Sequence, residues 1–206
     1  MAANRSSRTG STARPRRRLS TEERREQLLS VGSRLFARSP YDDVWIERVA
    51  EIAGVSRGLL YHYFPTKREF FAAVVRQESE RMLRLTAAVP GRPLREQIDA
   101  GIDLFLSYVE QHAEGFRAFH RAEAAGDPTV REVYRASLAA QEQQILGALA
   151  GSRPNGAPDG PALRLAVRGW LAFLVTVCLD WLDEPDLGRD EVRELCARAL
   201  LGAISE

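Results

Sequence analysis

The segment DDVWIERVAEIAGVSRGLLYHYFPTKREFF, residues 42–71, is the most informative part of this sequence. Its apolar spacing predicts two short helices, one from about Val44 to Ala53 and one from about Ser56 to Phe64. Gly54 stands between them, where glycine often adopts the left-handed conformation that ends a helix. Ser56 is a residue type that caps the start of a helix. The segment therefore predicts a helix-turn-helix, a motif that places its second helix in the major groove of DNA.

The second of these helices has an unusual exposed side. If Leu60 faces the core, a step of about 100° per residue places Gly58 and His62 on the opposite side. Leu59 and Tyr61 flank that strip. A helix side that carries hydrogen-bonding groups and a small residue suits the edges of base pairs.

Capping signals delimit the neighbouring helices. Ser20–Glu23 has the pattern of a capping box, and the helix that it opens is expected to stop at about Arg38, before Ser39-Pro40. Thr66–Glu69 has the same pattern and opens a long helix that is expected to end near Ala88.

Helix signals recur along the rest of the chain and strand signals do not, which predicts an all-α protein of about nine helices. Gly/Pro-rich residues 151–161 predict a loop. The remaining helices are expected at about residues 93–110, 115–123, 128–150, 161–182 and 189–204.

The basic charge is concentrated at one end of the chain. The net charge is +1 over 206 residues, yet the first 20 residues hold six arginines and no acidic residue. This segment has no periodic apolar residues, so we expect it to be disordered alone. Two interpretations stay open: a solvated extension, or an arm that follows phosphates or enters a minor groove. The predicted parts are a basic arm (1–19), a helix-turn-helix domain (20–66) and a larger helical domain (67–206).

Enzymatic, metal and membrane functions find no support in the residue patterns. The two cysteines, Cys178 and Cys196, lack a metal or redox spacing and are expected to be reduced and buried. No catalytic or phosphate-binding motif is present, so we expect neither an enzyme nor a cofactor. The longest uncharged apolar run, residues 169–179, is shorter than the ~20 residues that cross a bilayer. A cytoplasmic protein without a membrane partner is expected.

Residues 49–71, VAEIAGVSRGLLYHYFPTKREFF, resemble the DNA-binding signature of the TetR family of transcriptional regulators. The resemblance covers about residues 20–70, and beyond residue 75 only size and helical layout agree. It implies a homodimeric, ligand-responsive repressor that binds palindromic operator DNA. It also implies that the C-terminal part holds a ligand site and the dimer interface. The positions that carry the resemblance are Ala50, Gly54, Val55, Ser56, Gly58, Leu60, Tyr61, Phe64 and Lys67.

Physical roles can be assigned to the predicted DNA contacts. Arg57 can donate to guanine or phosphate, and Gly58 lets the helix approach base edges closely. Lys67 stands at a helix start, where its ammonium and the free amides both favour a phosphate. The predicted DNA-binding residues are Trp45, Arg57, Gly58, Leu59, Tyr61, His62, Tyr63, Thr66 and Lys67.

Two positions depart from the family pattern. Trp45 stands where the family usually has Ser or Thr, so Asp43 is the candidate cap of that helix. Trp45 either donates its indole hydrogen to phosphate or packs, and packing is favoured. Leu59 replaces a small or hydroxylated residue and could contact a thymine methyl group.

The last two predicted helices, about 161–183 and 189–204, are candidates for a dimer interface. The first is apolar around most of its circumference and must be covered on both sides. A second copy could cover it by two-fold symmetry, whereas burial within a monomer is the alternative.

A pocket for a small effector, flat or apolar in character, is expected among the middle helices. Two alternatives stay open for this fold: an activator, or a DNA binder that needs no effector. The candidate ligand-binding residues are Phe105, Tyr108, His112, Phe116, Phe119, His120, Tyr134, Trp170 and Phe173.

Overall fold

The computed structural model describes residues 19–87, 89, 91–150 and 160–204. Within these residues the chain is helical and contains no strand, which confirms the all-α prediction. The elements are α1 (Thr21–Phe36), the short 3-10 helix η1 (Tyr41–Asp43), α2 (Ile46–Ala53), α3 (Arg57–Tyr63), α4 (Lys67–Leu85), α5 (Leu94–Gln111), α6 (Ala113–Ala124), α7 (Pro128–Ala150), α8 (Gly160–Asp183) and α9 (Arg189–Ile204).

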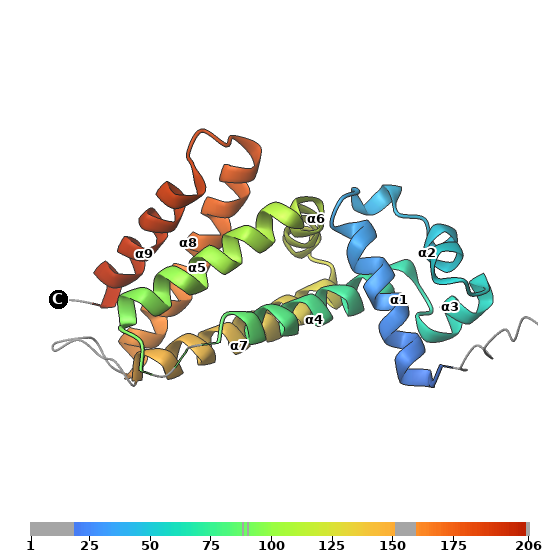
Figure 1. Ribbon diagram of the computed structural model, residues 1–206, viewed down its shortest axis with the longest axis horizontal. Coiled ribbons are helices and arrows are strands. Elements are labelled where there is room, and N and C mark those ends of the chain that lie inside the picture. The colour runs from blue at the N-terminus through green and yellow to red at the C-terminus, as the bar shows by residue number, and fades with distance from the viewer. Residues whose placement is uncertain (1–18, 88, 90, 151–159, 205–206) are drawn as a thin grey trace, which may run out of the picture.

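The molecule is elongated, with α1–α3 at one end and α8 and α9 at the other (Figure 1). The long helix α4 leaves the first end and runs beside α7, and α5 packs against α9. Helix α6 lies between the two ends (Figure 1). This arrangement makes α4, α6 and α7 the physical connection between the helix-turn-helix and the rest of the protein.

The predicted caps explain several helix starts. Ser20 and Glu23 form the complete capping box of α1, in which each side chain accepts from the other residue's backbone amide. Thr66 Oγ1 accepts from the amide of Glu69 at the start of α4. Gly54 ends α2 with a φ of 66°, a conformation that costs glycine little.

One apolar core joins the helix-turn-helix to the middle of the protein. Leu28, Leu60 and Phe70 are fully buried in it, and they come from α1, α3 and α4. Ala118 and Phe119 of α6 belong to the same cluster. The first turns of α4 therefore lie in the core of the helix-turn-helix, although the predicted domain boundary falls between residues 66 and 67.

A second core joins α5, α8 and α9. It includes Leu106, Val167 and the two cysteines, Cys178 and Cys196, which are buried and unpaired as expected. Among the described residues, α8 is the one helix that is long and apolar enough to cross a membrane. Its buried side packs against α5, α7 and α9, which is how a core helix of a folded domain packs.

Some predicted boundaries were wrong. Helix α2 begins at Ile46 and not near Val44, because η1 occupies the residues just before it. Helix α4 ends at Leu85, three residues before the predicted end. The predicted basic arm lies outside the described residues apart from Leu19, and so does most of the predicted loop at 151–161.

Candidate DNA-binding interface and effector cavity

Helix α3 exposes the predicted strip. Arg57, Gly58, Leu59 and His62 are exposed, whereas Leu60 has no exposed surface. A side chain at Gly58 would meet no other atom within 4 Å, so this part of the helix is open to a close partner. The orientation inferred from Leu60 is therefore confirmed.

Aromatic packing holds α3 in place. Phe64, the C-cap of α3, is buried and lies edge-on to Phe70 of α4, with ring centroids 5.0 Å apart. The Arg25 guanidinium of α1 lies 5.5 Å from the centre of the Phe64 ring. Tyr61 and Tyr63 are half-buried beside this core. Each tyrosine therefore keeps part of its surface accessible to a phosphate.

Arg57 has two contacts within the protein. Its Nη1 lies 2.8 Å from Glu47 Oε1 of α2, and its guanidinium lies 5.4 Å from the centre of the Tyr61 ring. A contact from Arg57 to DNA would therefore compete with a carboxylate of the same motif.

Lys67 and Thr66 are held at the start of α4. Lys67 Nζ donates to the carbonyl oxygen of Asp42 at 3.1 Å and lies 4.4 Å from the centre of the Tyr41 ring. Burial lowers the pKa of Lys67, while Asp42 and Asp43 act in the opposite direction. Lys67 is thus held against η1, and its ammonium retains hydrogens for a further partner.

The two expectations about the start of α2 were wrong. Asp43 lies in η1 and does not cap α2, whose N-cap is Trp45 without a side-chain hydrogen bond. Trp45 is also not packed, because 69% of its surface is exposed. A tertiary hydrogen bond, from Lys67 to the Asp42 carbonyl, helps to hold η1 as a separate turn.

A cavity of about 100 Å³, here called the proximal cavity, lies between the helix-turn-helix and the middle helices. Its wall includes Ser33, Phe36 and the C-cap Ala37 of α1 and Phe71 of α4, with the rest from α4 to α8. Sequence reasoning missed this contribution of α1 and α4. Their apolar stripes did predict burial, but nothing in the local pattern shows which buried residues border a cavity. Of the nine candidate ligand residues, seven line it: Phe105, Tyr108, His112, Phe116, Phe119, His120 and Tyr134.

The other two candidates lie elsewhere. Trp170 lines a second cavity, and its indole Nε1 donates to the carbonyl oxygen of Cys196. Phe173 is on the outer side of α8 with 36% of its surface exposed, so its assignment to the pocket was wrong. Trp170 and Phe173 are three positions apart, so their side chains point about 60° apart around the helix. Only the fold shows which of the two faces inward.

The polar groups of the proximal cavity are mostly occupied or neutral. His112 Nδ1 lies 2.9 Å from the Tyr108 carbonyl oxygen, and the two rings are stacked. Burial lowers the pKa of His120 to about 4, so its imidazole is neutral at pH 7. Glu78 accepts from Ser33 Oγ at 2.8 Å and pairs with Arg81 at 3.3 Å. The cavity therefore presents a largely uncharged wall.

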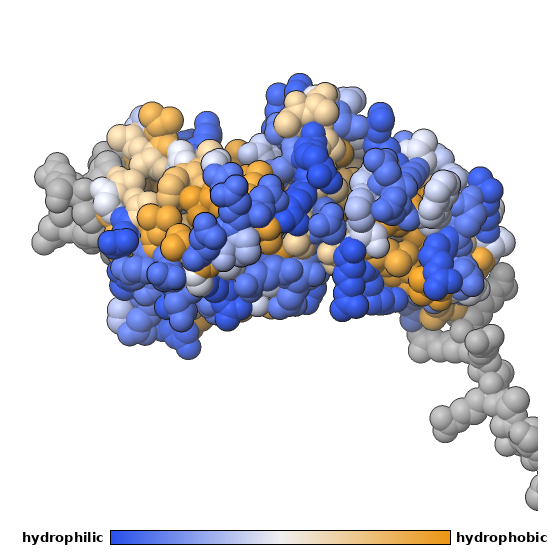
Figure 2. All heavy atoms as spheres, turned by 90° about the horizontal axis from the view of Figure 1, so that it is seen from above, coloured by the Kyte–Doolittle hydropathy of each residue, from blue (hydrophilic) through white to orange (hydrophobic). Residues whose placement is uncertain are grey.

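Exposed apolar side chains gather at the end formed by α8 and α9 (Figure 2, left). Leu165 has 71% of its surface exposed, and Phe173 of the same helix and Leu195 of α9 are also exposed. These three are among the large apolar side chains that the described part of the chain leaves exposed.

The exposed recognition helix, carried on a helix-turn-helix and joined to a separate helical body, defines a DNA-binding transcriptional regulator. Residues 28–74 match the family model described as bacterial regulatory proteins, tetR family. Residues 94–202 match the model described as tetracyclin repressor-like, C-terminal domain. The chain belongs to the TetR family of transcriptional regulators and is a regulator rather than an enzyme.

Similar proteins extend over most of the chain. The HTH-type transcriptional activator FasR of Mycolicibacterium smegmatis is 26% identical over 192 residues, which cover 91% of this chain and 86% of that protein. The HTH-type transcriptional repressor SCO4008 of Streptomyces coelicolor is 28% identical over 172 residues, which cover 80% of this chain and 86% of that protein. A crystal structure of a TetR-family regulator from Streptomyces coelicolor superposes with a TM-score of 0.79 at 29% identity, covering 90% of this chain and 82% of that one.

Proposed function

We propose that the protein is a homodimeric repressor that binds a palindromic operator and is released by a small, mostly apolar effector in the proximal cavity. The observation that carries this proposal is the composition of the cavity wall. Phe36 of α1 and Phe71 of α4 belong to the helix-turn-helix core, and they line the cavity together with residues of α5–α7. An occupant therefore touches both the DNA-binding end and the body of the protein.

Coupling requires that the effector prefers one arrangement of these helices over the other. Helix α6 is tightly packed at this point, because a Cβ at Gly115 would lie 3.0 Å from the Phe36 carbonyl oxygen. On the other side, Arg117 Nη2 donates to the Leu182 carbonyl oxygen of α8 at 2.6 Å. A displacement of α6 would thus act on α1 and on the α8–α9 end together.

The DNA contacts proposed are those of the exposed strip and its flanks. α3 would enter the major groove, with half-sites about one helical turn apart or slightly more. Arg57, Leu59 and His62 would contact bases, and Gly58 would let α3 approach the base edges closely. Phosphate contacts fall to Trp45, Tyr61, Tyr63, Thr66 and Lys67.

The exposed face of α8 and α9 would bind the same face of a second copy. A symmetric pairing buries Leu165, Phe173 and Leu195 and explains why an apolar helix is covered by its own protein on one side only. A dimer also positions two copies of α3 for the two half-sites. The protein would act in the cytoplasm, where the DNA is.

An activator is the second candidate, supported by the name of the 26% identical relative, which is a transcriptional activator. A reporter gene behind the upstream region of the protein's own gene separates the two. Deletion of the regulator should raise expression if it represses and lower it if it activates.

The binding test uses the same upstream region as a labelled DNA duplex. Tyr61→Ala and Lys67→Ala should each weaken binding by about tenfold or more, whereas Gly147→Ala, on the outer side of α7, should not change it. Unchanged affinity in both DNA-face variants would overturn the interface. Equal affinity for random DNA would favour a binder without an operator.

A further inference from the structure

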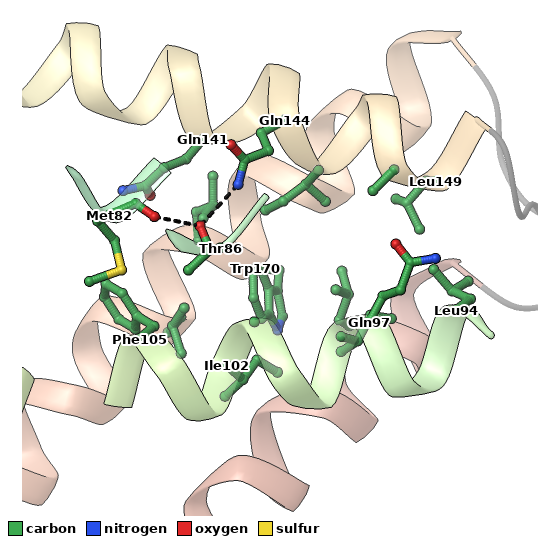
Figure 3. A pocket seen from close by; sticks show the side chains of 17 residues that line it. Met82, Thr86, Leu94, Gln97, Ile102, Phe105, Gln141, Gln144, Leu149 and Trp170 are labelled. Carbon is green, nitrogen blue, oxygen red and sulfur yellow. Dashed lines mark hydrogen bonds between the residues drawn. The ribbon is translucent and has the colours of Figure 1, made fainter. Parts of the chain in front are cut away.

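A second cavity, here called the distal cavity, continues from the proximal one. It has a volume of about 120 Å³ and lies between α4, α5, α7, α8 and α9. Met82, Phe105 and Gln141 line both cavities, so the two meet at these side chains. Figure 3 shows the distal cavity extending from Met82 and Phe105, past Trp170, to Leu94 and Gln97. Each cavity is on the scale of the ~150 Å³ site that holds one benzene molecule.

The two walls differ in chemistry. The proximal wall is rich in rings, among them Phe36, Phe71 and Phe119. The distal wall is mostly aliphatic and includes Ile98, Leu149 and other leucines and isoleucines. Rings offer flat faces and edges to a flat group, whereas branched aliphatic side chains pack around a flexible chain.

Few charged side chains line the two cavities. Of the described residues that line either cavity, none is Lys or Arg, and Glu78 is the one carboxylate. Glu78 already has Ser33 and Arg81 as partners. In the distal cavity Gln144 donates to Thr86, which donates to the Met82 carbonyl oxygen (Figure 3). A buried charge on a ligand would find no unoccupied counter-charge here.

We propose that the two cavities form one site for a neutral molecule with a flat ring and an aliphatic tail, the ring in the proximal and the tail in the distal cavity. The ring then lies against α1 and α6, and the tail reaches toward α8 and α9. Ser137 and His120 of the proximal wall supply hydrogen-bonding groups for a hydroxyl on the ring. This assignment rests on the proposed effector site and names its chemical class.

The test measures binding to the full-length protein by titration calorimetry with a matched set of probes. Para-ethylphenol and para-heptylphenol share a neutral ring and differ in the tail. Each buried methylene should tighten binding about fourfold, so the longer probe should bind at least about 100-fold more tightly. Para-heptylbenzoate and para-heptylbenzylamine carry a negative and a positive charge at pH 7.5, and each should bind at least about tenfold more weakly than para-heptylphenol.

A variant locates the tail. A Cβ at Gly101 meets no atom within 4 Å, and Gly101 lines the distal cavity. Gly101→Leu should therefore fill the tail space and reduce the chain-length gain to below about tenfold, while para-ethylphenol binds within about twofold of wild type. Gly147→Leu is the matched control, because Gly147 is exposed on α7 and lines neither cavity.

Equal affinity for the two phenols in the wild-type protein would overturn the two-part site without needing any variant. Binding of either charged probe as tight as para-heptylphenol would overturn the neutral class. Adding para-heptylphenol to the complex with operator DNA then separates the two proposals. Binding that tightens with tail length but does not release the protein from operator DNA would support this site and contradict the effector mechanism.

Discussion

Arg57 and Glu47 form an ion pair between the two helices of the helix-turn-helix, with 2.8 Å between Nη1 and Oε1. Both side chains are about half exposed, so the pair contributes little to stability. The pair matters for DNA binding. The Arg57 cation of the recognition helix is held by the Glu47 carboxylate, and the negative charge of Glu47 is repelled by the phosphates of DNA.

Glu47→Gln should tighten DNA binding. The substitution releases Arg57 and removes a negative charge from the interface, and we expect about two- to tenfold higher affinity at low salt with a steeper salt dependence. Fluorescence anisotropy on operator DNA at several salt concentrations measures both. Glu51→Gln is the control, since Glu51 is on the same helix and pairs with Arg48. An equal gain in the control would assign the effect to net charge alone.

Gly32→Ala should destabilise the protein. A Cβ at residue 32 would lie 2.5 Å from Phe70 Cζ and 2.7 Å from Val74 Cγ2, and both side chains are buried. Overpacking costs about 1–3 kcal/mol and outweighs the helix propensity of alanine, which is worth about 1 kcal/mol. Gly147→Ala, with open space at its Cβ, should instead stabilise by up to about 1 kcal/mol. Urea unfolding of both variants tests the opposite signs.

The helix-turn-helix could be predicted because its signals are local. The caps and the glycine after α2 are set by residues within a few positions of one another, and the apolar spacing within α3 identifies Leu60 as its core-facing residue. Leu60 alone was enough to predict the orientation of α3, because in a regular helix the direction of one side chain determines the directions of all the others.

The start of α2 could not be predicted in the same way. Asp43 has the chemistry of a cap, but a turn at residues 41–43 places it before the helix start. Lys67, 25 residues along the chain, hydrogen-bonds this turn. Contacts between distant segments also determine which residues line the cavities. The sequence identified most of the aromatic residues of the proximal wall, but it did not show that α1 contributes to that wall.

His120 should make stability depend on pH. Its pKa in the folded protein is lowered by burial from 6.5 to about 4, so the unfolded chain binds a proton more readily between these values. The stabilisation present above about pH 6.5 is therefore lost as the pH falls, by about 2 kcal/mol between pH 7.5 and 5. His120→Gln should show a pH dependence smaller by that amount in urea unfolding.

Leu165→Asp should break the proposed dimer. A carboxylate at this exposed site on α8 would be buried without a partner in a symmetric interface. Light scattering should show a monomer, and affinity for the two-half-site operator should fall by about 100-fold or more, because binding loses its second half-site. Leu104→Asp is the matched control, since Leu104 is an exposed leucine of α5 and belongs to neither α8 nor α9. A dimer that persists in the Leu165 variant would place the interface elsewhere.

Trp45→Ser should raise stability and lower DNA affinity. An exposed tryptophan at an uncapped helix start is unfavourable locally, and such departures are expected where a residue serves binding. Serine would cap α2 and stabilise the fold by about 0.5–2 kcal/mol, but it would remove the apolar surface and indole donor offered to the DNA backbone. Trp45→Ala separates the effects, because it removes the indole without adding a cap. Both variants should bind operator DNA more weakly, and only Trp45→Ser should gain thermal stability. Undiminished affinity in Trp45→Ala would show that the indole does not contact DNA.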